Sequence, residues 1–250
     1  MEKHALITGG GTGVGAEIAR HLAQTGAKVT IAGRRPEPLD LVASTNSRIY
    51  AVEADVTDEN SVAQMFEKAT QANGPVNIVI ANAGAADSAP FAKMELESFQ
   101  RMLDVNLIGT FLTFQKGLQN LKGQEYGRLI AIASIAGLHG YPYVAHYCAA
   151  KHGVVGMVKS LALELASKPF TVNAVCPGYT QTPMLQRSID NIMQKTGMDE
   201  EKARAALYRT NPQQRFIQPD EVAATVAWLI SEGARSVTGQ SISVSGGETQ

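Results

Sequence analysis

The sequence predicts an α/β fold in which one doubly wound, mostly parallel sheet carries helices on both of its faces. Short apolar runs alternate with longer segments of helical periodicity along all 250 residues. Several of the apolar runs are uninterrupted, as expected of parallel strands that are covered on both faces. No linker, repeat or low-complexity block breaks this order, so residues 1–250 are expected to form one domain rather than two.

The first half of the chain contains four expected strands separated by three helices. Ile18, Ala19 and Leu22 share one face of the first helix, and Gly26 ends it. Pro36 opens the second helix, because proline suits a first helical turn. In order, the expected elements are a strand at 5–7, a helix at 13–26, a strand at 28–32, a helix from 36, a strand at 49–53, a helix at 55–73 and a strand at 76–81.

The second half continues the alternation with longer helices. The expected elements are a helix at 99–121, a strand at 129–133, a helix at 145–167, a strand at 170–175, a helix at 220–230 and a strand at 242–244. Residues 179–215 depart from this pattern and contain a single helical stretch at 199–208. An insertion before the last helix lies near the carboxyl ends of the strands, so we expect it to form a substrate lid.

The composition argues against several classes of partner. Hydrophobic residues make up 44% of the chain and charged residues 18%, and the formal net charge is -1. Nothing therefore indicates a nucleic acid or an anionic membrane as a partner. Cys148 and Cys176 are too few for a disulfide framework and are expected to be buried thiols. The chain opens on an apolar strand instead of a signal peptide and has no window of ~18 apolar residues, so we expect a cytoplasmic protein.

A glycine-rich turn joins the first strand to the first helix. Residues 8–15 read Thr-Gly-Gly-Gly-Thr-Gly-Val-Gly. Glycine lets the backbone turn tightly and approach a pyrophosphate, while the start of the helix offers free N–H groups and the positive end of its dipole. An ordinary glycine turn is the alternative, but the position between strand and helix favours a dinucleotide site. The residues expected to hold the phosphates are Gly9, Thr12, Gly13, Val14 and Gly15.

Tyr147 and Lys151 are four residues apart in the helix at 145–167 and therefore share one of its faces. A tyrosine with the usual pKa of about 10 is a poor base at neutral pH, and a neighbouring ammonium lowers its pKa toward the working range. Ser134 ends a strand at the carboxyl edge of the sheet, where doubly wound folds bind ligands, and its hydroxyl could orient a carbonyl oxygen. The alternatives are a core tyrosine beside an extended lysine, and a serine that satisfies only backbone groups.

Asn106 lies inside an expected helix, although asparagine is a poor helix former. It therefore either caps or kinks the helix or has a chemical role. His146 and His152 flank the tyrosine and lysine, but they point to different faces of their helix. No cysteine or carboxylate cluster lies near them in the sequence, so no metal site is expected.

These motifs, in this order, resemble the short-chain dehydrogenase/reductase family with its Rossmann-type fold. The resemblance rests on the Thr-Gly-x3-Gly-x-Gly spacing of the turn, Asn-Ala-Gly at 82–84, Ser134, Tyr147-x3-Lys151, Pro177-Gly178 and Ser-Gly-Gly at 245–247. It implies an NAD(P)(H)-dependent oxidoreductase that moves a hydride between nicotinamide and a carbonyl or alcohol carbon. It also implies a catalytic set of Asn106, Ser134, Tyr147 and Lys151, in which Asn106 holds a water in a proton relay to Lys151.

The resemblance places the choice between NAD(H) and NADP(H) at the end of the second strand. Where NAD enzymes usually carry an acidic residue for the ribose 2′-hydroxyl, this chain has Gly33, followed by Arg34 and Arg35. A guanidinium would pair with a 2′-phosphate, so NADP(H) is favoured and NAD(H) remains possible. Against this, Thr12 stands where many NADP enzymes have a basic residue. Asp55 is expected to accept the adenine amine, or else to cap the following helix. The other cofactor residues implied are Val56, Asn82, Ala83, Gly84, Pro177, Gly178, Thr180 and Thr182, together with Tyr147 and Lys151.

The segments at 147–157 and 173–184 are similar to ketoacyl reductases and to the ketoreductases of aromatic polyketide pathways. This similarity implies a 3-oxoacyl thioester of CoA type, either reduced or formed in the reverse oxidation. A cyclic or aromatic free ketone is the alternative, and a nucleotide-binding scaffold without turnover is a third reading. The expected pocket wall is apolar and aromatic, and comprises Leu138, His139, Tyr141, Tyr143, Tyr179, Met184 and Leu185.

The resemblance also implies an assembly and a docking surface. Members of the family usually form homotetramers through their two long helices, here 99–121 and 145–167. Reductases that use acidic carrier proteins present two basic residues beside the active-site mouth, and the matching positions here are Glu125 and Lys168. Opposed charges would disfavour such a carrier, so a small or CoA-linked ketone is expected to be the better substrate.

Overall fold

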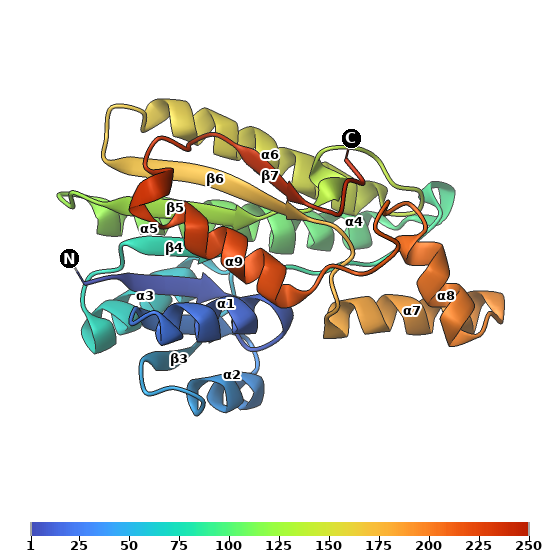
Figure 1. Cartoon of the computed structure of the whole chain (residues 1–250), viewed down its shortest axis with the longest axis horizontal. Coiled ribbons are helices and arrows are strands. Elements are labelled where there is room, and N and C mark those ends of the chain that lie inside the picture. The colour runs from blue at the N-terminus through green and yellow to red at the C-terminus, as the bar shows by residue number, and fades with distance from the viewer. Residues whose placement is uncertain (1, 250) are drawn as a thin grey trace.

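A seven-stranded parallel sheet forms the centre of the structure, a computed structural model that describes residues 2–249. Its strand order is β3-β2-β1-β4-β5-β6-β7, and every neighbouring pair is parallel (Figure 1). The strands are β1 (His4–Thr8), β2 (Lys28–Gly33), β3 (Ile49–Glu53), β4 (Ile78–Ala81), β5 (Gly127–Ile132), β6 (Phe170–Pro177) and β7 (Ser241–Val244). The α/β architecture expected from the alternating pattern is therefore confirmed.

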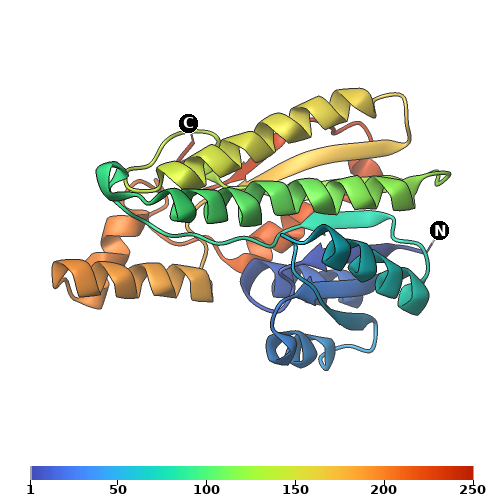
Figure 2. The same ribbon diagram turned by 180° about the vertical axis from the view of Figure 1, so that it is seen from behind.

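Helices cover both faces of the sheet. One face carries α1 (Gly13–Gln24), α2 (Pro36–Ala43) and α9 (Pro219–Leu229), which pack into one apolar core. The opposite face carries α3 (Glu59–Asn73), α5 (Gly109–Leu121) and α6 (Ala145–Glu164), which pack into a second core. Figure 2, seen from behind Figure 1, shows α5 and α6 running side by side over that second face.

Alternating side chains explain why the strands read as unbroken apolar runs. Leu6 pairs with Val79 in the register of β1 and β4, and both point into the core beneath α3, α5 and α6. The next pair, Ile7 and Ile80, points into the core beneath α1 and α9. Because successive strand residues face opposite sides and both sides are covered, almost every position must be apolar.

The expected helix at 99–121 is longer and less regular than its periodicity suggested. It begins as α4 (Leu96–Leu103), widens into a π-helical turn at Asp104–Ile108, and continues as α5. Asn106 lies in the wide turn, where its side-chain Nδ2 donates to the Met102 carbonyl oxygen at 3.0 Å. Such turns are frequent at functional sites.

The helix expected from residue 55 begins only at Glu59. Asp58 supplies the N-cap, because its carboxylate accepts a hydrogen bond from the backbone N–H of Ser61. The reading of Asp55 as the cap of this helix is therefore wrong. The Asp55 carboxylate instead accepts from the backbone N–H and hydroxyl of Thr57, at 2.9 and 2.8 Å.

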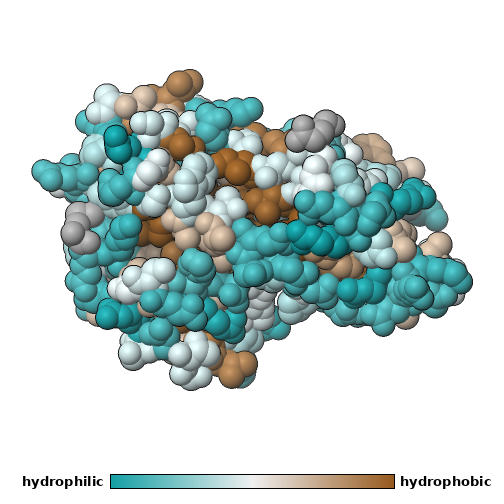
Figure 3. Space-filling view, in the orientation of Figure 1, coloured by the Kyte–Doolittle hydropathy of each residue, from teal (hydrophilic) through white to brown (hydrophobic). Residues whose placement is uncertain are grey.

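Two helices, where one was expected, lie between β6 and α9. The expected stretch at 199–208 is α8 (Glu200–Tyr208), and α7 (Pro183–Thr196) precedes it. The two helices share a small core of their own, formed by Leu185, Ile189, Ala203 and Phe216. In Figure 1 they extend beyond the sheet, and in Figure 3 their visible surface is largely hydrophilic. The expected elements left out α7, although Leu185, Ile189, Ile192 and Met193 recur along it at helical spacing.

Across residues 2–249, no helix combines the length and the apolar character that crossing a membrane would require.

Candidate active site

Four strand ends meet at one edge of the sheet and carry the polar residues singled out in the sequence. The strand order reverses between β1 and β4, and doubly wound sheets bind ligands at carboxyl ends beside such a reversal. The glycine turn follows β1, residues 82–84 follow β4, Ser134 follows β5 and Gly178 follows β6. The catalytic and cofactor positions expected from the sequence thus share one edge.

The glycine turn adopts a backbone that other residues would not accept readily. Gly9 and Gly13 have φ of 67° and 56°, in the left-handed region. α1 begins at Gly13, and the side chain of Thr12 makes no capping hydrogen bond. Within the described chain, this cap therefore leaves the first N–H groups of the helix, the favourable end for a phosphate, open to a ligand.

Thr8 and Asn82 tie the glycine turn to the end of β4. The Thr8 hydroxyl accepts hydrogen bonds from the backbone N–H groups of Asn82 and Ala83, at 3.0 and 3.1 Å. The Asn82 Nδ2 donates to the carbonyl oxygens of Thr8 and Gly9, at 2.9 and 3.1 Å. The Asn82 side chain thus fixes the backbone of the glycine turn through two carbonyl oxygens. Thr8 was not among the expected site residues, although it immediately precedes the glycines.

Ser134, Tyr147 and Lys151 come together at the end of β5. The Ser134 hydroxyl accepts from the backbone N–H of Ala136 at 3.1 Å, and it lies close enough to the Tyr147 phenol for hydrogen bonding to lower the pKa of that phenol. The Lys151 Nζ donates to the Ile132 carbonyl oxygen at 3.0 Å and lies 5.6 Å from the centroid of the Tyr147 ring. Three functional groups from two elements therefore face one small volume.

Burial shifts the pKa values of both titratable groups of this cluster. It raises the pKa of Tyr147 to about 12, although the hydrogen bond with Ser134 acts in the opposite direction. Burial lowers the pKa of Lys151 to about 8. Both shifts disfavour the charged form, as desolvation does. Perturbed groups of this kind are typical of functional sites.

The wide turn between α4 and α5 brings Asn106 to the same cluster. Its Nδ2 donates to the Ala85 carbonyl oxygen at 2.9 Å, and its Oδ1 accepts from the Ala85 N–H at 3.3 Å. A Cβ built on Gly84 would lie 2.8 Å from the Asn106 Oδ1 and 3.8 Å from the Lys151 Nζ, so Gly84 sits between them. Asn106 is fully buried and fixes the loop after β4 beside the lysine.

Arg34 and Asp55 lie together at the expected adenosine end. Arg34, Asp55 and Lys68 line one shallow surface depression, and both Arg34 and Arg35 are exposed. Partial burial pushes the pKa of Asp55 upward, but hydrogen bonds from Thr57 and the charge of Arg34 outweigh it and hold the pKa below its usual value. Glu53 and Asp55 balance the charges of Arg34 and Lys68 in the depression, so an anionic group would be bound by the exposed Arg34 and Arg35 side chains at its rim.

The segment after β6 approaches the glycine turn from the other side. The Thr182 side chain would lie 3.1 Å from a Cβ on Gly13, and its hydroxyl caps α7 by accepting from the Leu185 N–H at 3.3 Å. The Thr180 hydroxyl donates to the Gly178 carbonyl oxygen at 2.9 Å. Pro177 ends β6, so these threonines stand above the strand end as expected.

The expected pocket wall is only partly assembled around Tyr147. The rings of Tyr141 and Tyr179 contact edge to face with centroids 6.3 Å apart, and His139 lies against Tyr141 at 4.8 Å. Leu138 and Met184 are half-buried. Tyr143 is 64% exposed, and Leu185 is buried in the core of α7 and α8 instead of facing outward.

One residue of this region was missed altogether. Glu248, near the end of the chain, accepts a hydrogen bond from the Tyr141 hydroxyl at 2.6 Å. The two residues are 107 positions apart, so no local sequence pattern could have paired them.

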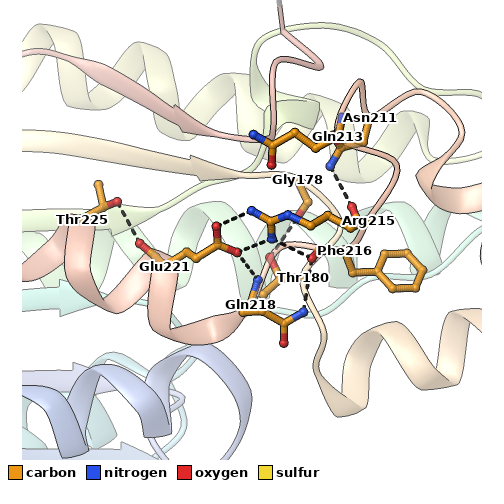
Figure 4. Close-up of polar contacts among 9 residues, drawn as sticks. All are labelled: Gly178, Thr180, Asn211, Gln213, Arg215, Phe216, Gln218, Glu221 and Thr225. Carbon is orange, nitrogen blue, oxygen red and sulfur yellow. Dashed lines mark hydrogen bonds and ion pairs between the residues drawn. The ribbon is translucent and has the colours of Figure 1, made fainter.

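The connection between α8 and α9 is held beside the site by a bidentate ion pair. The Arg215 Nη1 and Nη2 each lie 2.7 Å from a Glu221 carboxylate oxygen, and Glu221 also accepts from the Gln218 N–H (Figure 4). Thr180 forms an isolated parallel bridge with Ile217. The α7–α8 segment is thus anchored where it leaves and where it rejoins the sheet.

Glu125 and Lys168 do not flank the mouth of this site. Both precede their strands, and the N–H of Gly127 donates to the Pro169 carbonyl oxygen, which places them at the amino edge of β5 and β6. Ser134 lies at the carboxyl edge, a full strand length away. The expectation that these two charges stand beside the mouth of the same chain's site is wrong, because parallel strands carry their two ends on opposite edges.

The edge fits a dinucleotide on the chain's own features. An uncapped helix start suits a pyrophosphate, and the exposed Arg34 and Arg35 suit a further phosphate beyond it. The Tyr147 cluster lies at the other side of the strand-order reversal, beyond the carboxyl end of β5. Adenosine and nicotinamide ends therefore have separate and chemically suitable surroundings.

Comparison with known proteins supports the same reading. Residues 9–249 match the family model described as enoyl-(acyl carrier protein) reductase. The chain is 34% identical to a D-beta-hydroxybutyrate dehydrogenase of Rhizobium meliloti, covering 100% of this chain and 99% of that protein. It is also 34% identical to a 3-oxoacyl-[acyl-carrier-protein] reductase of Rickettsia felis, covering 98% and 96%. A crystal structure of a variant actinorhodin polyketide ketoreductase with NADPH superimposes with a TM-score of 0.96 at 33% identity, covering 100% of this chain and 98% of that one.

The family model covers nearly the whole chain, and both relatives are 34% identical to it over almost their full length. The chain is therefore an oxidoreductase for ketone and alcohol groups, and it belongs to the short-chain dehydrogenase/reductase family.

Proposed function

We propose that the protein reduces a ketone to a secondary alcohol with NADPH, and that its substrate is a 3-oxoacyl thioester of CoA type. The same site would serve the reverse 3-hydroxyacyl oxidation. The observation that carries the proposal is the meeting of Tyr147, Ser134 and Lys151 at the edge that also holds the glycine turn, with the Lys151 Nζ 5.6 Å from the centroid of the Tyr147 ring.

The chain's own groups would handle the carbonyl oxygen and its proton. The bound nicotinamide would supply the hydride. The hydroxyls of Ser134 and Tyr147 bind the carbonyl oxygen, and Tyr147 gives up its proton as negative charge develops there. The Lys151 ammonium favours the phenolate left behind and lowers its pKa. Asn106 holds the wide turn beside Lys151, where a water can return the proton from solvent.

NADP(H) is the proposed cofactor, with NAD(H) as the weaker one. Arg34 and Arg35 are exposed at the end of β2, where no carboxylate follows the strand directly. A guanidinium binds a phosphate with charge-assisted hydrogen bonds. The similar polyketide ketoreductase was crystallised with NADPH, which favours the same cofactor here. Gly9, Val14, Gly15, Asp55, Val56, Ala83 and Gly178 would complete the cofactor site.

Residues 179–215 would act as the lid over the substrate. Their outer surface is polar, and the Asn191 Nδ2 donates to the Ser88 hydroxyl at 3.3 Å, so α7 reaches the loop after β4. The substrate would lie between this lid and the loop that follows Ser134, against the rings of Tyr141 and Tyr179.

A cyclic or aromatic free ketone is the second candidate substrate. Its support is the similarity to a polyketide ketoreductase and the aromatic character of the pocket wall. Stacking surfaces of this kind suit planar rings.

The working form would be a homotetramer in the cytoplasm. Ile108 and Phe111 are each 42% exposed and Leu163 is 80% exposed, all on or beside the long helices α5 and α6. Apolar residues on such helices favour contact with another copy. Cys148 and Cys176 are free thiols, as in a reducing compartment. No partner from nucleic acid or membrane is expected at a net charge of -1.

The test replaces the phenol alone. Tyr147→Phe should lower kcat for acetoacetyl-CoA reduction by about 10²–10⁴-fold without changing the dissociation constant of NADPH, because the ring is kept and the transferable proton is lost. Tyr50→Phe, the same change on the exposed face of β3, serves as the matched control. A Tyr147→Phe variant as fast as this control would refute the mechanism.

Substrate class is decided in the same assay. We expect higher kcat/KM for acetoacetyl-CoA than for a cyclic diketone. Turnover of the free ketone alone would promote the second candidate. Binding of NADPH without turnover of any ketone would instead identify a scaffold.

A further inference from the structure

The pocket region contains a hydrogen-bonded cluster that the reaction above does not use. The Tyr141 hydroxyl donates to the Glu248 Oε1 at 2.6 Å, and the Thr210 hydroxyl donates to the same oxygen at 2.6 Å. The His139 Nε2 lies 2.7 Å from the Tyr141 oxygen. Three distant segments meet here: the loop after β5, the connection after α8, and the C-terminal tail.

The Glu248 carboxylate is connected to the reacting groups through two tyrosine rings. The Tyr141 ring contacts the Tyr179 ring edge to face at 6.3 Å. Burial raises the pKa of Tyr179, and the charge of Glu248 raises it further. Tyr179 in turn lies close enough to Tyr147 for its charge to affect the pKa of that phenol. Tyr141 and Tyr179 thus link Glu248 to the surroundings of the Tyr147 hydroxyl.

No salt bridge involves this carboxylate among residues 2–249. The salt bridges of the described chain all lie elsewhere, and both donors to Glu248 are neutral hydroxyls. Arg204, on α8, is engaged by Glu200 at 3.6 Å and by Gln181 at 3.0 Å. The half-buried tail therefore presents a net negative charge to the pocket wall.

We propose that Glu248 is a specificity-determining residue that excludes ketones and alcohols bearing a free carboxylate close to the reacting carbon. The Glu248 carboxylate would repel a carboxylate on the ligand, and this repulsion weakens binding of the free acid without adding any contact to a neutral ligand. A neutral ester, a free ketone, or a thioester whose phosphates lie far from the carbonyl escapes the repulsion. The proposal rests on the function proposed above and narrows its substrate class.

This selectivity would separate the chain from one of its relatives. The Rhizobium meliloti protein is named a D-beta-hydroxybutyrate dehydrogenase, and hydroxybutyrate is a small free acid. With an unneutralised carboxylate beside the pocket, this chain would discriminate against such an acid.

The experiment compares two ligands that differ in charge at one position, acetoacetate and ethyl acetoacetate. Wild-type protein should have the higher kcat/KM for the ester with NADPH. Glu248→Gln keeps an oxygen that can accept from Tyr141 and Thr210 but removes the charge. It should raise the acid-to-ester ratio of kcat/KM by about five- to thirtyfold, which corresponds to about 1–2 kcal/mol of repulsion between two partly screened charges. Taking the ratio cancels any general loss of activity, and the gain should shrink at high salt.

Glu232→Gln is the matched control. Glu232 is an exposed carboxylate whose charge acts on Tyr126, directly before β5 at the amino edge of the sheet. The same loss of one charge there should leave the acid-to-ester ratio at its wild-type value. An unchanged ratio in Glu248→Gln, or an equal change in both variants, would overturn the proposal.

Calorimetric titration makes the result independent of turnover. Acetoacetate and ethyl acetoacetate are titrated against the NADP⁺-saturated protein and both variants, and the ratio of dissociation constants replaces that of kcat/KM. If Glu248→Gln changed the ratio of dissociation constants but no ketone were turned over, the proposed function would be refuted and the role of Glu248 supported. If the ratio of dissociation constants were unchanged in Glu248→Gln and turnover were normal, the role of Glu248 would be refuted and the proposed function supported.

Discussion

Gly137 offers a test of how closely the two halves of the catalytic cluster must be held. It ends a single 3-10 turn, Ile135–Gly137, which follows Ser134 directly. A Cβ at this position would lie 2.7 Å from the Lys151 carbonyl oxygen and 2.9 Å from its carbonyl carbon. Both are backbone atoms of α6, which cannot yield as the end of a flexible side chain would. Gly137→Ala must therefore push the turn that carries Ser134 away from the helix that carries Tyr147 and Lys151.

The size of the displacement follows from the contact distance. Ordinary van der Waals contact begins at 3.4 Å, so a group at 2.7 Å must move by about 0.7 Å. A misplacement of about 1 Å costs on the order of 10²-fold in rate when reacting groups must be aligned. We therefore expect kcat to fall about ten- to a hundredfold. Overpacking should also destabilise the fold by about 1–3 kcal/mol.

Gly140→Ala is the matched control, because it makes the same change in the same loop and its Cβ would meet nothing within 4 Å. Steady-state kinetics and NADPH titration are measured on both variants at a temperature well below their unfolding transitions. We expect the loss in kcat only in Gly137→Ala, with the NADPH dissociation constant within about threefold of wild type, since the glycine turn is untouched. Equal kcat in the two variants would refute the view that this close approach sets the Ser134–Tyr147 geometry.

Three further predictions concern the cofactor, the lid anchor and the proton. Arg34→Ala should raise KM for NADPH about ten- to a hundredfold and barely change KM for NADH, since a charge-assisted hydrogen bond contributes about 1.5–3 kcal/mol. If only Arg35→Ala raised KM for NADPH, Arg35 would be the residue that contacts the 2′-phosphate. The hydrogen bonds from Arg215 hold the pKa of Glu221 at about 2. The ionised pair therefore stabilises the fold at pH values above the ordinary carboxyl pKa of about 4.3, and this stabilisation is lost as the pH falls toward 2. Glu221→Gln should flatten the decrease in Tm over that window, and an unaltered slope would contradict it. Burial raises the pKa of Tyr147 to about 12, so the phenol remains protonated at neutral pH. The rate of alcohol oxidation should therefore rise with pH, whereas the rate of ketone reduction should not. A reduction rate that rises with pH would exclude Tyr147 as the proton donor.

Much of the fold could be predicted because its determinants are local. Buried parallel strands must be apolar at nearly every position, and covering helices must be apolar every three or four residues. The glycine turn was visible for a similar reason, since a tight approach at a helix start requires glycines at fixed spacing. The pair of Tyr147 and Lys151 was predictable because four residues complete about one helical turn.

Features that depend on contacts between distant residues could not be predicted from the sequence. The wide turn around Asn106 exists because its side chain bonds with both Met102 and Ala85, one on its own helix and one on the loop after β4. α7 packs against α8 around Leu185, Ile189 and Ala203, a contact between two separate helices. Neither partner can be inferred from periodicity alone.

The sequence by itself determined the order of strands and helices, the glycine turn, and which side chains could carry acid–base chemistry, because these follow from residue type and short spacing. Only the tertiary structure decided which strand ends face the site, and it moved Glu125 and Lys168 to the opposite edge. It also brought Glu248 to Tyr141 from 107 residues away. Such pairings arise when the whole sheet closes and buries its apolar faces, and that burial is a property of the assembled chain rather than of any segment.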